Sequence, residues 1–208
     1  MSTGRRVAEV REATEVEAPV LARRLRDAFR DDPVQRWLFP HPAAYEARGL
    51  ANFELTLRRM LEVGLVHTTA GLEGAALWLP PGRDLLERPG GSRFGLRSVL
   101  ALRGAIVRGA RFFAALARHH PRGPHWYLPV LGTAPEYQGR GVASALLRAL
   151  LARSDAEGLP AYLESSKERN LAFYGSHGFE LQGTVCAPGG PTVWPMLRAP
   201  RSGAGGAA

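Results

Sequence analysis

The chain has 208 residues, of which 45% are hydrophobic and 22% are charged. This composition is that of an ordinary globular protein able to bury a core, and no apolar run approaches the roughly 18 residues of a membrane-spanning helix. Cys186 is the only cysteine, which excludes an internal disulfide and favours a cytoplasmic protein. The six histidines are scattered, so we predict no metal site.

The net charge of +8 comes almost entirely from arginine, because Lys167 is the only lysine. A strongly basic protein can bind nucleic acid, but these arginines are spread over several predicted helices instead of being gathered in one tail. We therefore predict neither a nucleic-acid partner nor a membrane partner. The excess charge either reflects an arginine-rich composition or gives a positive rim to a site for a phosphate-bearing ligand.

The chain begins with short elements of both kinds. Alternation of apolar and polar residues predicts a strand over Val7–Glu12, and helical spacing predicts a helix over Glu15–Arg30. Asp32-Pro33 then supplies a helix N-cap followed by proline at the first helical position. It starts a short helix that runs through Trp37-Leu38-Phe39.

A longer helix is predicted from about Ala43 to Glu62, followed by a hairpin of two strands, Leu65–Ala70 and Glu73–Leu79, around Gly71. Two helical segments, apolar on one side and arginine-rich on the other, are predicted over Ser92–His120. They either pack on the edge of the domain or cover a substrate pocket.

The centre of the chain predicts a strand, a glycine loop and a helix. Trp126–Leu131 is an apolar run typical of a buried strand, and the helix that follows from Val142 has one apolar face. Between them, Gly139 and Gly141 allow a ligand to approach the backbone closely. The first amides of a helix are unpaired and its dipole favours negative charge, so the loop is predicted to bind phosphate.

Two common phosphate loops do not fit this stretch. A P-loop would have Lys-Ser or Lys-Thr after its last glycine, where this chain has Val142 and Ala143. A dinucleotide-binding loop has its glycines directly after the strand and a third Gly or Ala where Ser144 stands. Here Thr133–Tyr137 separate the strand from the glycines.

The C-terminal part of the chain returns to strands. Ala161–Ser165 is predicted as a buried strand, and Asn170–Ser176 as a short helix ended by a Gly-Phe turn. Phe179–Val185 and Thr192–Leu197 are predicted as two final strands. We expect residues 1–201 to form a single domain, and the Gly- and Ala-rich tail over 202–208 to be disordered.

The glycine loop resembles the pyrophosphate loop of the GNAT superfamily of acetyl-CoA-dependent N-acyltransferases, whose pattern Gln-x-x-Gly-x-Ala is met by Gln138, Gly141 and Ala143. A second stretch, from Leu163-Glu164-Ser165-Ser166 to Gly178-Phe179, is also similar to that family. The resemblance covers about residues 126–185. It implies an α/β fold with a mixed, strongly bent sheet, a V-shaped split between two central strands, and helices on both faces.

One branch, the puromycin N-acetyltransferase-like proteins, is similar over nearly the whole chain. The stretches that carry this likeness are Phe29 with Asp32-Pro33, Trp37-Leu38-Phe39-Pro40, Ala76–Gly82, and Gly190-Pro191 with Trp194 and Met196.

The resemblance implies acetyl-CoA as the acyl donor, with CoA as a product. Backbone amides near Val130 and Leu131 would hold the pantetheine arm and the acetyl carbonyl, and Asn170 would bond the same arm. The pyrophosphate would lie on a continuous run of loop and helix residues: Gln138, Gly139, Arg140, Gly141, Val142, Ala143 and Ser144.

By the same resemblance, Tyr174 would protonate the departing sulfur, since a phenol with a pKa of about 10 is close enough to a thiol of about 8.5 for concerted transfer. The alternative for Tyr174 is a core tyrosine beside Phe173. The strand over Trp126–Leu131 offers no carboxylate, which leaves Glu164 as the candidate base, directly or through a water. We expect Glu136 to be a solvated loop residue.

The sequence therefore predicts an N-acetyltransferase. The stretches that relatives place around the acceptor contain few carboxylates, so we expect a small, largely apolar primary amine, either aminonucleoside-like or derived from an amino acid. Two alternatives remain, a CoA-binding sensor or partner module without turnover, and an acetyltransferase of a protein or peptide amine. The protein is expected to be a monomer or a homodimer.

Overall fold

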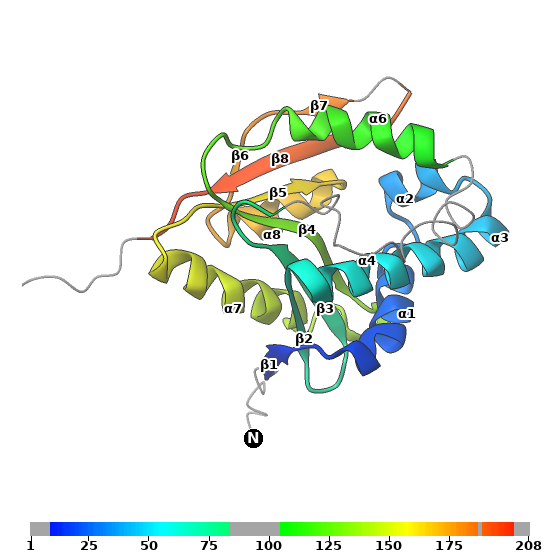
Figure 1. Ribbon diagram of the computed structural model, residues 1–208, viewed down its shortest axis with the longest axis horizontal. Coiled ribbons are helices and arrows are strands. Elements are labelled where there is room, and N and C mark those ends of the chain that lie inside the picture. The colour runs from blue at the N-terminus through cyan, green and yellow to red at the C-terminus, as the bar shows by residue number, and fades with distance from the viewer. Residues whose placement is uncertain (1–8, 84–104, 187–188, 202–208) are drawn as a thin grey trace, which may run out of the picture.

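The computed structural model describes residues 9–83, 105–186 and 189–201. Within these residues eight strands form one sheet in the order β1-β2-β3-β4-β5-β8-β6, and β7 pairs with β8 (Figure 1). All neighbouring strands are antiparallel except β4 and β5. The strands are β1 Val10–Glu12, β2 Leu65–Thr69, β3 Gly74–Leu79, β4 Trp126–Thr133, β5 Ala161–Ser165, β6 Glu180–Leu181, β7 Val185–Cys186 and β8 Thr192–Arg198.

Helices cover both faces of the sheet (Figure 1). Helix α7 packs on one face, and α1 and α4 pack on the other. The described helices are α1 Ala18–Ala28, α2 Pro33–Leu38, α3 Pro42–Ala44, α4 Leu50–Val63, α6 Ala105–Ala117, α7 Val142–Ala156 and α8 Leu171–Gly175, with single turns η1 Glu15–Glu17, η3 Pro135–Tyr137 and η4 Glu168–Asn170. None of these helices is long and apolar enough to cross a membrane.

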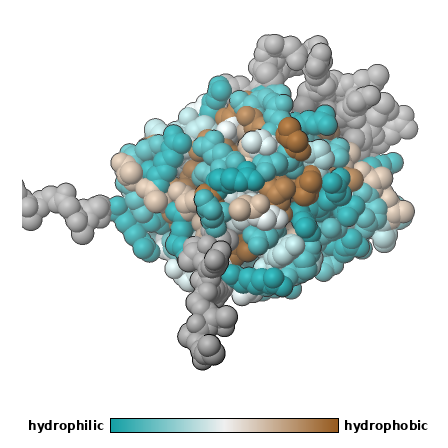
Figure 2. Space-filling model, turned by 90° about the horizontal axis from the view of Figure 1, so that it is seen from below, coloured by the Kyte–Doolittle hydropathy of each residue, from teal (hydrophilic) through white to brown (hydrophobic). Residues whose placement is uncertain are grey.

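The apolar core lies in two layers separated by the sheet. On the α7 side, Leu146, Leu147 and Leu150 pack against Leu128 of β4 and Leu163 of β5. On the other side, side chains of α1 and α4 pack against alternate residues of β3. On the face of the molecule seen in Figure 2, hydrophilic residues surround small groups of apolar ones.

Strands β4 and β5 form a fork. They pair in parallel only from Trp126↔Ala161 to Leu128↔Leu163, and beyond these three pairs β4 continues beside β3 alone. The fold predicted from the resemblance, including the split between the two central strands, is therefore confirmed. Just before the fork, β4 carries one extra residue relative to β3, since Val130 lies opposite Leu77 but Tyr127 lies opposite Leu79.

The predicted helix over residues 43–62 is interrupted, which is a correction. After α3, the segment Tyr45–Gly49 forms a π-helical turn before α4 begins at Leu50. The Tyr45 hydroxyl donates to the Arg26 carbonyl at 2.6 Å. The Tyr45 ring packs against Gly49 so closely that a Cβ there would lie only 2.9 Å from the ring carbons. The extra residue of the π-turn accommodates this ring.

The predicted continuous strand over 179–185 is wrong. The segment divides into β6 and β7, separated by Gln182–Thr184, because Gly183 has a φ of +135°, which L residues rarely adopt. In this break the Gln182 amide donates to the Pro195 carbonyl of β8 at 2.8 Å. The predicted elements over 7–8 and 92–104, and the tail over 202–208, lie outside the described residues.

Candidate active site

The glycine loop joins β4 to α7 through the single turn η3. Gly139 and Gly141 have φ values of +72° and +83°, so both adopt the left-handed conformation that favours glycine. A Cβ on Gly139 would meet no described atom within 4 Å, so the backbone there faces open space. Gly141 is the N-cap of α7, and no described side chain caps this helix. The amides of Val142–Ser144 are therefore available to an anion.

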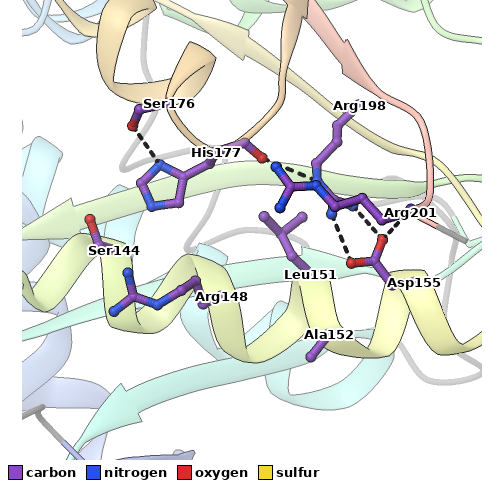
Figure 3. Close-up of a pocket in the computed structure, with 9 residues that line it drawn as sticks. All are labelled: Ser144, Arg148, Leu151, Ala152, Asp155, Ser176, His177, Arg198 and Arg201. Atoms are coloured by element: carbon purple, nitrogen blue, oxygen red, sulfur yellow. Dashed lines mark hydrogen bonds and ion pairs between the residues drawn. The ribbon is translucent and has the colours of Figure 1, made fainter. Parts of the chain in front are cut away.

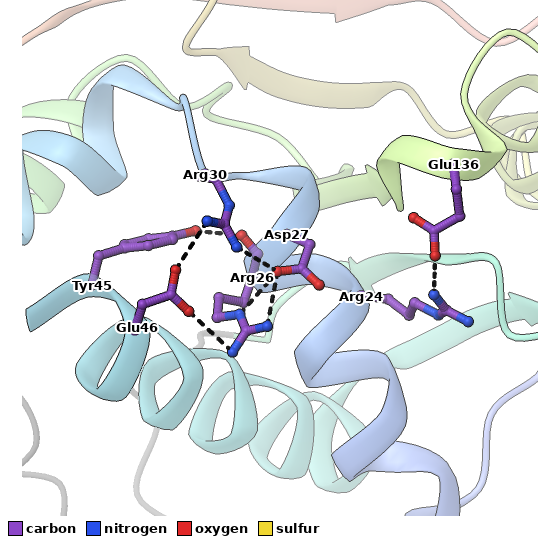
Figure 4. Close-up of polar contacts among 7 residues, drawn as sticks. All are labelled: Arg24, Arg26, Asp27, Arg30, Tyr45, Glu46 and Glu136. Carbon is purple, nitrogen blue, oxygen red and sulfur yellow. Dashed lines mark hydrogen bonds and ion pairs between the residues drawn. The ribbon is translucent and has the colours of Figure 1, made fainter. Parts of the chain in front are cut away.

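The loop is braced from two sides. The Gln138 side-chain amide donates to the Thr133 carbonyl at the end of β4 at 3.1 Å, so it closes the loop on the strand. From α1, the Arg24 guanidinium stacks 5.2 Å from the Tyr137 ring, and Arg140 stacks on the same ring at 5.4 Å. Arg24 also pairs with Glu136 (Figure 4), whose side chain is 52% exposed, so Glu136 is the exposed loop residue that the sequence predicted, held in a surface ion pair.

A cavity of about 540 Å³ continues from the loop along the outer side of α7 (Figure 3). Its lining brings together residues of α7, of the turn after α8 and of the end of β8: Ser144, Arg148, Leu151, Ala152, Asp155, Ser176, His177, Arg198 and Arg201. Apart from Ser144, these residues were not singled out from the sequence. A signal was present, since 144, 148, 152 and 155 recur at the spacing of one helix face.

One ion pair fixes the far end of this cavity. The Arg198 guanidinium, on a side chain only 3% exposed, donates to both carboxylate oxygens of Asp155 at 2.7 and 2.8 Å. It also donates to the His177 carbonyl at 3.1 Å. Hydrogen bonds from this guanidinium hold the pKa of Asp155 below its ordinary value. The pair thus joins α7, β8 and the turn after α8.

At the fork, a cluster of polar and aromatic side chains lies on the sheet face opposite α7. Glu164 is the first residue of β5 past the last pair with β4, and its side chain is 5% exposed. Its Oε1 lies 3.0 Å from His120 Nε2. Apart from this close contact, Oε1 has no hydrogen-bond partner among the described residues. The Tyr162 hydroxyl is likewise buried without a partner in this part of the chain.

Tyr174 lies on the α7 side of the same strand. Its ring packs in the core cluster with Leu128 and Leu163, and contacts Phe173 at 5.2 Å and Phe179 at 6.0 Å between centroids. Tyr174 therefore does occupy the core position beside Phe173 that was its alternative role in the sequence analysis. Burial, with a further contribution from the negative charge of Asp32, raises the pKa of Tyr174, so the phenol stays protonated at neutral pH.

Asp32 links α2 to the strand of Glu164. It is 2% exposed, and its Oδ1 accepts hydrogen bonds from the amides of Val34 and Gln35 at 3.0 Å. Its Oδ2 accepts a hydrogen bond from the Ser166 hydroxyl, just past β5. Asn170 ends the turn η4 and makes no capping bond to α8.

The remaining predicted residues, Val130 and Leu131, lie on β4 just past the extra residue, where the strand has left β5. The structure thus gathers the candidates around one fork. Glu164 and Tyr174 lie on its two faces, and the glycine loop lies beyond the end of β4.

Comparison with known proteins decides the family. A model described as the acetyltransferase (GNAT) family matches residues 78–179, which include the fork and the glycine loop. An uncharacterised N-acetyltransferase of Schizosaccharomyces pombe is 31% identical over 176 residues, covering 77% of this chain and 70% of the relative. The chain belongs to the GNAT family of acetyltransferases.

Solved structures agree with this GNAT assignment. A protein from Corynebacterium glutamicum, described as histone acetyltransferase HPA2 and related acetyltransferase, is 29% identical with a TM-score of 0.70, covering 95% of this chain and 98% of that one. A putative arylalkylamine N-acetyltransferase 7 of the yellow fever mosquito has a TM-score of 0.60 at 18% identity, covering 91% and 86%, and so shares the fold. GNAT enzymes use acetyl-CoA as cosubstrate, and the glycine loop with its uncapped helix fits a diphosphate.

Proposed function

We propose that this GNAT protein is an acetyl-CoA-dependent N-acetyltransferase. It transfers the acetyl group to the primary amine of a small, largely apolar acceptor, aminonucleoside-like or derived from an amino acid. The observation that carries the proposal is the fork, where Glu164 and Tyr174 lie on opposite faces of β5. An amine can then approach from one face while the sulfur leaves toward the other.

The glycine loop would hold acetyl-CoA by its pyrophosphate, on the amides from Gly139 to Ser144. The backbone of Val130 and Leu131 would hold the pantetheine arm and receive negative charge from the acetyl carbonyl. Asn170 would bond the same arm. The cavity along α7, with Arg148 and other arginines in its lining, is suited to the remaining phosphate and the adenosine.

Tyr174 would supply the proton to the departing sulfur. Burial raises its pKa, so the phenol is protonated at physiological pH but is a weaker acid than a free phenol, and the proton transfer would have to be concerted with cleavage of the C–S bond. Glu164 would accept the proton of the amine, directly or through a water. The carboxylate is nearly buried and its Oε1 lacks a hydrogen-bond partner among the described residues, as expected of an acceptor kept for a ligand.

The apolar side chains of α2 and α6 support the proposed acceptor class. Trp37 of α2 packs on Phe112 of α6 at 5.6 Å, and Leu38 and Phe39 are buried beside them. Asp32 is already used as a helix cap, so Glu164 is left to balance one positive charge. A polycation such as an aminoglycoside would bring further charges without partners. We place the protein in the branch that resembles puromycin N-acetyltransferase. We further propose a cytoplasmic monomer or homodimer, without nucleic-acid or membrane partners.

A second candidate is acetylation of a peptide lysine, because the solved relative at 29% identity is described as HPA2-related histone acetyltransferase. Thiol release from acetyl-CoA separates the two when puromycin, arylalkylamines, aminoglycosides and lysine peptides are compared at one pH. We expect the first two classes to give the higher kcat/KM. A preference of tenfold or more for aminoglycosides or peptides, about 1.4 kcal/mol, would overturn the acceptor class. CoA binding with no turnover of any amine would favour a sensor module.

A further inference from the structure

Five titratable or aromatic side chains meet at the fork on the face opposite α7. Tyr127 comes from β4, Tyr162 and Glu164 come from β5, and His120 and His125 come from the segment between α6 and β4. The His120 ring lies 4.5 Å from the Tyr127 ring and 4.7 Å from the Tyr162 ring, between centroids. The His125 ring lies 5.8 Å from Tyr162. These contacts fix the position of His120 beside Glu164.

Two polar atoms of this cluster have no hydrogen bond of normal geometry within the described residues. They are the buried Glu164 Oε1, whose close neighbour is His120 Nε2 at 3.0 Å, and the buried Tyr162 hydroxyl, which lies near the Glu164 carboxylate. Leaving such groups unpaired costs free energy, so native proteins usually keep them for a ligand, an ion or water. Burial and the nearby Glu164 carboxylate raise the pKa of Tyr162, so its hydroxyl stays neutral. The cluster is suited to a ligand group with several N–H donors and one positive charge, which is a primary ammonium.

His120 is the more exposed partner of the buried Glu164 carboxylate. Its side chain is 26% exposed, whereas that of Glu164 is 5% exposed, so the imidazole reaches solvent more readily than the carboxylate does. His125 differs, since its Nδ1 donates to the Gly123 carbonyl at 2.7 Å, and burial is the main cause that lowers its pKa. His125 is therefore a neutral neighbour at pH 7.

We propose that His120 is the general base of the reaction, and that Glu164 beside it holds the acceptor ammonium and stabilises the imidazolium that forms. This role rests on the proposed N-acetyltransferase function and revises one part of it, because His120 takes the proton in place of Glu164. An imidazole, with an ordinary pKa of about 6.5, is a stronger base than a carboxylate with one of about 4.3. The groups facing His120 are Glu164 and Tyr162 of β5, Tyr127 of β4 and His125 of its own segment.

The protons balance as follows. The ammonium gives one proton to His120, which passes it to water. The freed lone pair attacks the acetyl carbonyl carbon of acetyl-CoA, the C–N bond forms and the C–S bond breaks. The thiolate takes a proton from Tyr174, while the nitrogen loses its second proton through His120, and Tyr174 is reprotonated from water. One ammonium and one acetyl-CoA thus give one amide, one CoA thiol and one proton.

The test compares His120→Gln with His119→Gln, using puromycin and 2-phenylethylamine as acceptors. His119 is the adjacent exposed histidine, whose Nδ1 bonds the Ala115 carbonyl, and it serves as the matched control. In His120→Gln we expect kcat/KM to fall by roughly 10²–10⁴-fold, and the acidic limb of its pH profile to disappear. His119→Gln should stay within twofold of the wild type, and CoA affinity measured by calorimetry should be unchanged in both variants.

Two further variants separate chemistry from structure. In His120→Ala, added imidazole should restore turnover in a concentration-dependent way, which no loss of packing would produce. If His120 and Glu164 act together, the double variant His120→Gln/Glu164→Gln should lose little more than either single one. A His120→Gln protein with wild-type kcat/KM and an unchanged pH profile overturns this role alone. A wild-type protein that releases no thiol with any amine overturns the proposed function and this role with it.

Discussion

The N-cap of α7 allows a sharp test of the phosphate site. Gly141 has a φ of +83° and a ψ of 7°, directly before the uncapped amides of the helix. Asp and Asn both tolerate this left-handed conformation better than other L residues, and they have nearly the same shape. Gly141→Asp and Gly141→Asn therefore differ mainly by one negative charge placed against the diphosphate.

The magnitude follows from Coulomb's law. Two unit charges about 4 Å apart repel by about 4 kcal/mol at an effective dielectric constant of about 20, and by about 1 kcal/mol in bulk water. Partial exposure of the glycine loop weakens this repulsion, whereas the several charges of the diphosphate strengthen it. We therefore take a repulsion of about 2–4 kcal/mol between the new carboxylate and the diphosphate. Gly141→Asp should then bind CoA about 30- to 800-fold more weakly than Gly141→Asn, since about 1.4 kcal/mol corresponds to tenfold.

Isothermal calorimetry with CoA measures this difference, and circular dichroism checks that both variants are folded. High salt provides an internal control, because the Debye length falls to about 3 Å at 1 M, so the gap between the variants should narrow. Equal CoA affinity in the two folded variants at low salt would refute the placement of the diphosphate at this helix.

Three other predictions concern chemistry and stability. Tyr174→Phe should lower kcat by roughly 10²–10⁴-fold with little change in CoA affinity. Asp155→Ala leaves the buried Arg198 guanidinium without its carboxylate and should lower the free energy of unfolding in urea by about 2–3 kcal/mol. The loss is smaller than for a fully buried pair, because the Asp155 side chain is 25% exposed. Hydrogen bonds from Arg11 lower the pKa of Glu17 to about 2. The contribution of Glu17 to stability is therefore complete above its ordinary pKa and should fade as the pH falls toward 2, so the stability gap to Glu17→Gln should narrow there.

Each of these has an outcome that contradicts it. Tyr174→Phe turning over at the wild-type rate across the pH range would remove Tyr174 from the mechanism. Asp155→Ala is compared with Glu46→Ala, which removes an exposed carboxylate and its pairs to Arg26 and Arg30 and should cost less than about 1 kcal/mol (Figure 4). Equal losses of unfolding free energy in these two variants would contradict the idea that burial makes the Asp155–Arg198 pair matter more for stability. A stability gap for Glu17→Gln that stays constant from pH 7 to pH 2 would contradict the assigned pKa.

Local structure could be predicted from the sequence where it depends on residues close together in the chain. The glycine loop could be predicted because Gly139 and Gly141 need positive φ angles between a strand and a helix. The π-turn at Tyr45 could not, because the carbonyl that its hydroxyl bonds belongs to Arg26, on another helix. The periodicity of one helix contains no information about such a contact.

The candidate site was predictable to a similar degree. The motif gave Tyr174 and Glu164, but it contained nothing about the pairing of Glu164 with His120, 44 positions earlier. That contact exists only because β4 and β5 lie side by side and the segment before β4 passes over them. In the sequence His120 was only one of six scattered histidines, from which no site was predicted. The buried pair of Asp155 and Arg198 was missed for the same reason.

The fork also has a mechanical consequence. Past Leu128 and Leu163 no strand-to-strand hydrogen bond has to break when a ligand enters between β4 and β5, and the two halves of the sheet pair directly through only three residue pairs among the described strands. What spans both halves is the core beneath α7, which includes Trp78 of β3 and Met196 of β8. Helix α7, whose first turn is the proposed diphosphate site, therefore also holds the two half-sheets together. A ligand that draws this helix toward itself would be expected to change the angle between the halves, and so the width of the opening between β4 and β5.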